Sequence, residues 1–81
     1  KERPDMVAHG DRTQHLVEMG RRIRLAREGR SWSPEDLAAR AGVTGPTVRA
    51  IEQGKSDVTT WTLRKLSAAL SMPAGYLGFG G

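Results

Sequence analysis

Cysteine is absent from this chain of 81 residues. Its absence excludes disulfide scaffolds, thiol catalysis and cysteine zinc sites, and it fits a protein of the reducing cytoplasm. Long apolar runs are missing too, so the sequence predicts neither a membrane-spanning helix nor a signal-peptide core. We therefore expect a cytoplasmic protein that makes no contact with a membrane.

Groupings of catalytic residues are also lacking. The sequence offers no Ser/His/Asp set on rigid elements, no carboxylate pair in a plausible cleft and no phosphate-binding loop. His9 and His15 lie close in sequence, but no further ligand cluster accompanies them, so we expect solvated histidines rather than a metal site. The sequence thus predicts no enzyme, no cofactor, no metal and no evident small-molecule site.

What the chain has in excess is positive charge. Its 13 Lys and Arg against 9 Asp and Glu give a net charge of +4, and its pI is about 10.4. A basic chain of this size indicates a polyanionic partner, most often nucleic acid. Ordinary surface charge that keeps a small protein soluble is the alternative.

Apolar residues recur at steps of three and four, and no strand candidate appears, so the sequence predicts an all-α fold. The expected helices cover residues 14–28, 34–41, 44–53 and about 60–70, and a last short turn begins near Pro73. Residues 1–13 lack this periodicity and are expected to form a flexible arm. The folded domain then spans 14–78, and 79–81 form a tail or linker. Tyr76 and Leu77 are expected to close the core.

Strong start signals precede the second predicted helix. Ser33 is a good N-cap, and Asp36 is a weaker capping-box partner for it. Trp32 precedes the cap and Leu37 follows it by four residues, which is the spacing of a hydrophobic staple. This spacing predicts that Trp32 belongs to the core rather than to a ligand site.

Residues 34–53 predict two short helices joined by a tight turn. Such a unit needs a small residue where the helices touch, a glycine in the turn, and apolar residues that hold the second helix down. Ala38 and Gly42 meet the first two needs. Val43, Val48 and Ile51 meet the third. A chance helical hairpin would match two or three of these positions, so the full set indicates a helix-turn-helix.

The stretch from Gly20 to Leu77 resembles the phage-repressor and Cro type of helix-turn-helix domain, the XRE family. "RRIRLAREGRSWSPEDLAARAGVT" is similar to the family's first two helices, "TVRAIEQGKS" to its third helix and following loop, and "TLRKLSAALSMPAGYL" to helices four and five. The resemblance implies a compact five-helix bundle of the lambda-repressor-like type. It also implies a sequence-specific, repressor-like transcription regulator that binds double-stranded DNA as a homodimer on a two-fold operator.

By the same resemblance, the third helix enters the major groove. The positions that face the groove are Thr44, Gly45, Pro46, Thr47, Arg49 and Ala50. Only Arg49 has strong base-reading chemistry, because its guanidinium can donate two hydrogen bonds to one guanine. The threonines can contact a phosphate or a thymine methyl group. Gly45, Pro46 and Ala50 cannot read bases by hydrogen bonding, so DNA shape, apolar contacts and the basic arm must add specificity.

Contacts to the DNA backbone have several candidates. Lys55 and Ser56 match the family's phosphate-binding loop. Three arginines are expected to add backbone contacts: Arg22, Arg24 and Arg40. Pro34 stands where the family often has a phosphate-binding Gln, and the acidic Glu35 and Asp36 weaken the anion site at that helix start. Such contacts set affinity and register but not sequence choice.

Glu52 lies beside the inward positions Val48 and Ile51 on the third helix. A carboxylate near a core needs a partner. The resemblance implies Arg27, on the first helix, as that partner in a purely structural pair. The alternative is that Glu52 reaches solvent at the edge of the core.

A second function remains open for the same fold. Gly45, Pro46 and Ala50 form a smooth patch that suits a protein partner, so a protein-interaction module or an antitoxin-type component is the alternative to a DNA-binding regulator. The positive net charge and the Lys55-Ser56 pair argue for DNA.

Overall fold

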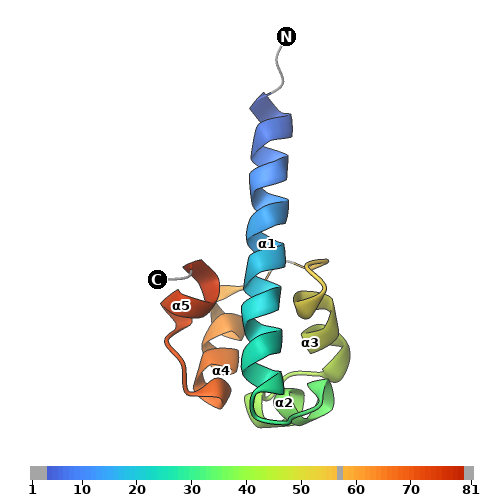
Figure 1. The fold of residues 1–81 in the computed structure, drawn as a ribbon, viewed down its shortest axis with the longest axis vertical. Coiled ribbons are helices and arrows are strands. Elements are labelled where there is room, and N and C mark those ends of the chain that lie inside the picture. The colour runs from blue at the N-terminus through green and yellow to red at the C-terminus, as the bar shows by residue number, and fades with distance from the viewer. Residues whose placement is uncertain (1–3, 57, 80–81) are drawn as a thin grey trace.

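The computed structural model describes residues 4–56 and 58–79, and every regular element in these ranges is an α-helix. In chain order the helices are α1 (Pro4–Glu28), α2 (Pro34–Ala41), α3 (Gly45–Glu52), α4 (Thr60–Leu70) and α5 (Ala74–Phe79). α1 runs along the molecule with α3 on one side and α5 on the other, and α2 lies below the C-terminal end of α1 (Figure 1). The predicted all-α, five-helix fold is confirmed.

Local capping signals determine where the short helices begin and end. Ser33 Oγ accepts a hydrogen bond from the backbone N–H of Asp36 at 3.0 Å, and Asp36 Oδ2 accepts one from the N–H of Ser33 at 2.9 Å. Gly42 ends α2 at φ 76°, a left-handed conformation that glycine adopts without steric cost. The hydroxyl oxygens of Thr44 and Thr59 cap α3 and α4. The turn between α2 and α3 therefore forms where the sequence predicts it.

One apolar core receives side chains from all five helices. Its buried members are Met19, Ile23, Leu37, Ala38, Ala41, Val48, Ile51, Leu66, Leu70 and Leu77. Trp32, Val43 and Leu63 are partly buried against this core. Val48 and Ile51 are nearly inaccessible, which seats one face of α3 in the core and leaves its other face turned outward.

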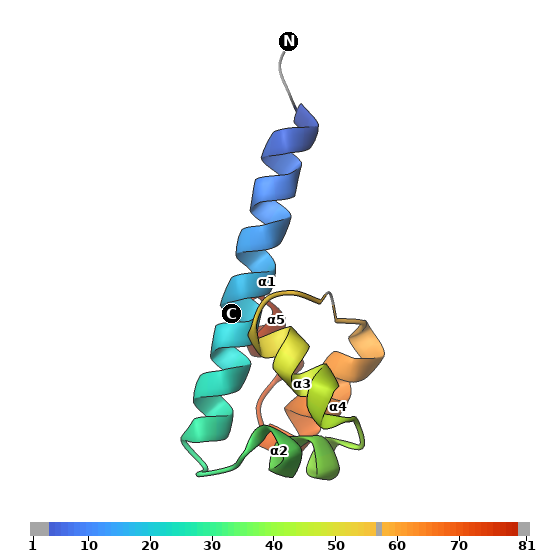
Figure 2. The ribbon, with the colours of Figure 1, turned by 90° about the vertical axis from the view of Figure 1, so that its right-hand side faces the viewer.

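α1 begins earlier than the sequence predicts. Residues 4–13, expected to be part of an arm without helical structure, are helical in the structure. This end of α1 extends past the other four helices in both views (Figures 1 and 2). Its sequence lacks the apolar periodicity from which helices are predicted. Pro4 fits the first helical turn, where its missing N–H costs nothing. The remaining arm residues, 1–3, lie outside the described residues.

The C-terminal helix differs from the prediction at one residue. Leu77 is fully buried as predicted, but Tyr76 is 41% exposed and does not close the core. Neighbouring residues on a helix point about 100° apart, so a helix as short as α5 buries one of the two and exposes the other. α5 continues to Phe79, the first residue of the predicted tail, and 80–81 lie outside the described residues.

Two kinds of feature are absent from the described part of the chain. Within 4–56 and 58–79, no helix combines the length and the apolar character needed to cross a membrane. In these ranges no three His, Cys, Asp or Glu residues gather in a way that could hold a metal ion.

Candidate nucleic-acid interface

The outer face of α3, which carries Pro46, Arg49 and Ala50, is joined to α2 by an ion pair. Arg49 Nη2, on α3, contacts Glu35 Oε2, on the first turn of α2. The two side chains are 48% and 55% exposed, so the pair lies at the surface of the α2–turn–α3 unit. Exposed ion pairs contribute only about 0–1 kcal/mol to stability, because water and salt screen them. The main effect of this pair is therefore to orient the Arg49 side chain.

Gly45, at the start of α3, leaves room for that pair. A Cβ atom at Gly45 would lie 3.1 Å from Glu35 Oε2 and 3.4 Å from Arg49 Nη1. Both neighbours are the ends of flexible side chains, so a larger residue would push them aside without disturbing the backbone. Gly45 cannot read a base by hydrogen bonding, but it leaves space for Glu35 and Arg49 to contact each other beside the first turn of α3.

The two threonines at the start of α3 contact each other. Thr44 Oγ1 lies 2.8 Å from Thr47 Oγ1 and accepts a hydrogen bond from the backbone N–H of Thr47 at 3.3 Å. A hydroxyl both donates and accepts, so a phosphate oxygen can be bound while the cap is kept. Beside them, Pro46 is exposed and Ala50 is partly buried. These two residues add apolar surface to the outer face.

The connection from α3 to α4 presents Lys55 beyond the end of α3. Its backbone N–H donates to the Ala50 carbonyl at 3.0 Å, while its side chain is exposed. Gly54, at φ 71°, lies so close to α1 that a Cβ there would be 3.0 Å from Val17 Cγ2. Ser56 follows and is partly buried. The loop is therefore held against α1 at Gly54 and carries an exposed lysine beyond the end of α3.

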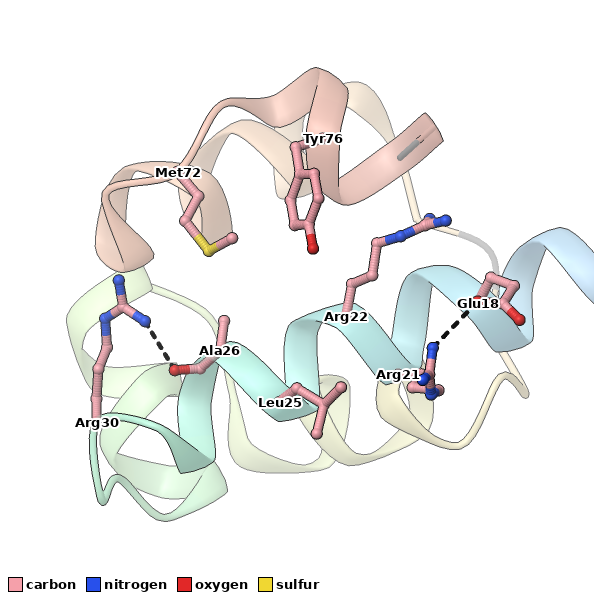
Figure 3. Close-up of a pocket in the computed structure, with 8 residues that line it drawn as sticks. All are labelled: Glu18, Arg21, Arg22, Leu25, Ala26, Arg30, Met72 and Tyr76. Carbon is pink, nitrogen blue, oxygen red and sulfur yellow. Dashed lines mark hydrogen bonds and ion pairs between the residues drawn. The ribbon is translucent and has the colours of Figure 1, made fainter. Parts of the chain in front are cut away.

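The three arginines predicted to bind the DNA backbone lie in different surroundings. Arg40 places its Cζ 4.3 Å from the centroid of the Trp32 ring, a cation–π contact. Arg24 is exposed on α1. Arg22 points toward α5 and lies 6.0 Å from the Tyr76 ring (Figure 3). Because α5 and α3 lie on opposite sides of α1 (Figure 1), the structure does not bring Arg22 to the α3 surface.

A groove of about 530 Å³ lies between α1 and the C-terminal segment. Its walls combine basic and apolar side chains, among them Arg21, Arg22, Arg30, Leu25, Met72 and Tyr76 (Figure 3). Arg21 is paired with Glu18 at 3.5 Å, and Arg30 donates to the carbonyls of Ala26 and Leu70. Two of the three guanidinium groups are therefore engaged within the protein, and the groove is separate from the α2–α3 surface.

A buried ion pair fixes the C-terminal end of α3. Arg27 Nε and Nη2 donate to the two carboxylate oxygens of Glu52 at 2.7 and 2.9 Å. Arg27 Nη1 donates to the Trp32 carbonyl at 2.7 Å. The side chains of Arg27 and Glu52 are only 10% and 7% exposed. The hydrogen bond to Glu52 raises the pKa of Arg27 against the opposing effect of burial. The contact implied by the family resemblance is thus present, and it links α3 to α1 and to the loop before α2.

The start of α2 carries negative charge. Hydrogen bonds from the backbone and side chain of Ser33 hold the pKa of Asp36 below its ordinary value of 3.8. Asp36 is therefore ionised at neutral pH, next in sequence to Glu35. The phosphate site that the family often forms at this helix start is correspondingly weak.

Gly20 is a structural residue that the sequence analysis missed. A Cβ at Gly20 would lie 2.3 Å from the Ile51 carbonyl oxygen and 2.9 Å from the Glu52 carbonyl oxygen. α1 and α3 therefore touch backbone to backbone at this point. One signal was available, because glycine inside a helix costs about 1 kcal/mol relative to alanine, and such a residue usually has a packing reason.

These features define a class of protein. In an all-α bundle, the short helix α3 follows a tight turn and packs one face against the core. A buried ion pair fixes its C-terminal end, and its outer face is exposed. This is a lambda-repressor-like helix-turn-helix domain. The model of the family described as "Helix-turn-helix domain" matches residues 18–75. The chain therefore belongs to the helix-turn-helix family, of the phage-repressor and Cro type.

Solved structures agree with this assignment. The chain is similar to the restriction-modification controller protein C.AhdI from Aeromonas hydrophila, with 31% identity, a TM-score of 0.78, and coverage of 83% of this chain and 97% of that one. It is also similar to the P22 c2 repressor protein, solved in complex with a synthetic operator, with 28% identity, a TM-score of 0.74, and coverage of 78% and 96%. No curated protein matches the chain.

Proposed function

We propose that this chain is a sequence-specific, repressor-like transcription regulator that binds double-stranded DNA with the outer face of α3 in the major groove. The observation that carries the proposal is the position of Arg49. It is half-exposed on the outward face of a helix whose other face is buried in the core. The P22 c2 repressor, which has the same fold, was solved with an operator, and this supports the same partner here.

Each residue of the outer face has a role suited to its chemistry. The Arg49 guanidinium donates to O6 and N7 of a guanine. Thr44 and Thr47 contact a phosphate or a thymine methyl group, and Lys55 and Ser56 contact the backbone beyond the end of α3. Pro46 and Ala50, with Gly45, allow close approach to base edges, so part of the specificity comes from DNA shape.

We infer that two copies act together on a two-fold operator. α3 has 8 residues, and a helix of that length extends only about 12 Å, so one copy reaches few base pairs. Dimers of this class bind half-sites roughly 34–36 Å apart, which doubles the number of contacts. Measuring how many copies bind a duplex with one half-site and a duplex with two half-sites tests this inference. Two copies on the second duplex would support it.

Binding to duplex DNA is expected to weaken steeply as salt rises. Each phosphate that the protein neutralises contributes about −0.9 to the slope of log K against log salt. A titration of mixed-sequence duplex at low and moderate salt measures this slope by fluorescence anisotropy. Lys55→Gln should reduce the slope by about 1 if Lys55 contacts a phosphate.

The same titration can contradict the proposal. If the protein does not bind duplex DNA even at low salt, the outer face of α3 serves another partner. The protein-interaction module would then become the better description of this domain.

A further inference from the structure

We propose that Glu35 moderates the specificity of Arg49, because its carboxylate holds the guanidinium on unmatched DNA and has to be displaced before a guanine can be read. The inference rests on the proposed function, because it assumes that Arg49 faces DNA. It assigns a role to an acidic side chain whose charge, taken alone, only weakens binding to DNA.

Glu35 contacts a nitrogen atom of Arg49 that a guanine would also use. Its Oε2 contacts Nη2 of Arg49, and Nη1 of Arg49 lies beside Gly45. Bidentate recognition of guanine uses two N–H groups of the same guanidinium. Arg49 must therefore leave or share the carboxylate when it reads a base.

The position of the carboxylate is set by the fold. Glu35 lies in the first turn of α2, whose start is fixed by the capping box of Ser33 and Asp36. Arg49 lies on a helix whose end is fixed by the buried Arg27–Glu52 pair. Glu35 and Arg49 therefore lie on two helices whose positions are fixed independently. Gly45 leaves the space in which their side chains meet.

A guanine can displace the Glu35 carboxylate from Arg49 more readily than a single phosphate can. A half-exposed ion pair contributes about 0–1 kcal/mol, whereas a good bidentate contact to the right base contributes about 1–3 kcal/mol. Unmatched DNA offers no such contact, so Arg49 stays with Glu35 there, while both kinds of DNA bring their phosphates toward the negative charge of Glu35. Specificity is a difference between two affinities, so a group that must be displaced only at the right site reduces it.

The test compares two affinities for each variant. A preferred duplex is first selected with the wild-type protein, and a second duplex replaces the guanine that depends on Arg49. Glu35→Gln should strengthen binding to the first duplex more than to the second, so the ratio of the two affinities should rise by up to about fivefold. Thermal unfolding, measured for each variant, should stay close to that of the wild type.

Three further variants separate this role from others. Asp36→Asn removes the neighbouring negative charge but keeps an oxygen acceptor for Ser33, so it should strengthen both complexes equally and leave the ratio unchanged. Gly45→Ala keeps every charge and crowds the ion pair, so it should raise the ratio in the same direction as Glu35→Gln. In an Arg49→Ala background, Glu35→Gln should no longer change the ratio.

Distinct results overturn the inference and the function beneath it. If the wild type discriminates between the duplexes but Glu35→Gln and Gly45→Ala leave the ratio intact, the specificity role of Glu35 is refuted while DNA binding stands. If Glu35→Gln raises the ratio as much in the Arg49→Ala background, Glu35 does not act through Arg49 and the inference is equally refuted. If the wild type binds neither duplex at low salt, the proposed function fails and this inference fails with it.

Discussion

Replacing Glu52 with glutamine is expected to lower the free energy of unfolding by about 3 kcal/mol. The substitution keeps the shape of the side chain but removes its charge. Arg27, 10% exposed at its side chain, then remains as a buried cation whose bidentate partner is lost. Leaving one member of a buried pair uncompensated is among the most destabilising single changes in a protein.

Thermal or urea unfolding of Glu52→Gln measures this effect, and for a domain of this size the melting temperature should fall by roughly 10–20 °C. Glu28→Gln is the matched control. Glu28 lies 3.8 Å from the same arginine but is 54% exposed, so its loss should cost less than about 0.5 kcal/mol. An unchanged melting temperature for Glu52→Gln would show that the pair does not stabilise the position of α3.

Gly20→Ala is expected to destabilise the domain by about 1–3 kcal/mol. The added methyl group would meet the carbonyl oxygens of Ile51 and Glu52 at 2.3 and 2.9 Å. Neither atom belongs to a flexible side chain, so α1 and α3 must move apart. This shift would also stretch the Arg27–Glu52 hydrogen bonds, because the same two helices supply them.

Gly75→Ala provides the control for Gly20→Ala. It is the same chemical change inside a helix, but no atom lies within 4 Å of the new methyl group. Alanine has the higher helix propensity, so this control should be neutral or stabilising by up to about 1 kcal/mol. If denaturant unfolding finds Gly20→Ala as stable as Gly75→Ala, the close contact between α1 and α3 is not required.

The fold could be predicted from the sequence because its signals are local. The caps at Ser33 and Thr44 and the glycine at 42 define both ends of α2 and the start of α3 within a few residues of chain. The apolar spacing that predicts each helix also predicts which face is buried. The N-terminal part of α1 could not be predicted in this way, because its sequence carries no apolar stripe.

The site could be predicted only in part, because spacing does not say which side chains meet across helices. The chemistry of Arg49 identifies it in the sequence, but its partner Glu35 is 14 positions earlier, and the sequence shows only the charge of that residue. The structural roles of Gly45 and Gly20 depend on how closely neighbouring helices and side chains approach each glycine, and this closeness is a property of the packed structure. Arg22 was grouped with other basic residues, although its position on α1 directs it toward α5.

The central claim is that α3 reads DNA through Arg49, and paired selections from random duplexes test it most directly. The wild type and Arg49→Ala are each used to select their preferred sites under the same salt conditions. The account predicts that the variant loses the preference for guanine at one position in each half-site, with a loss of about 1–3 kcal/mol on the wild-type site. Recovery of the same motif by both proteins would contradict the assignment of Arg49 as the base-reading residue.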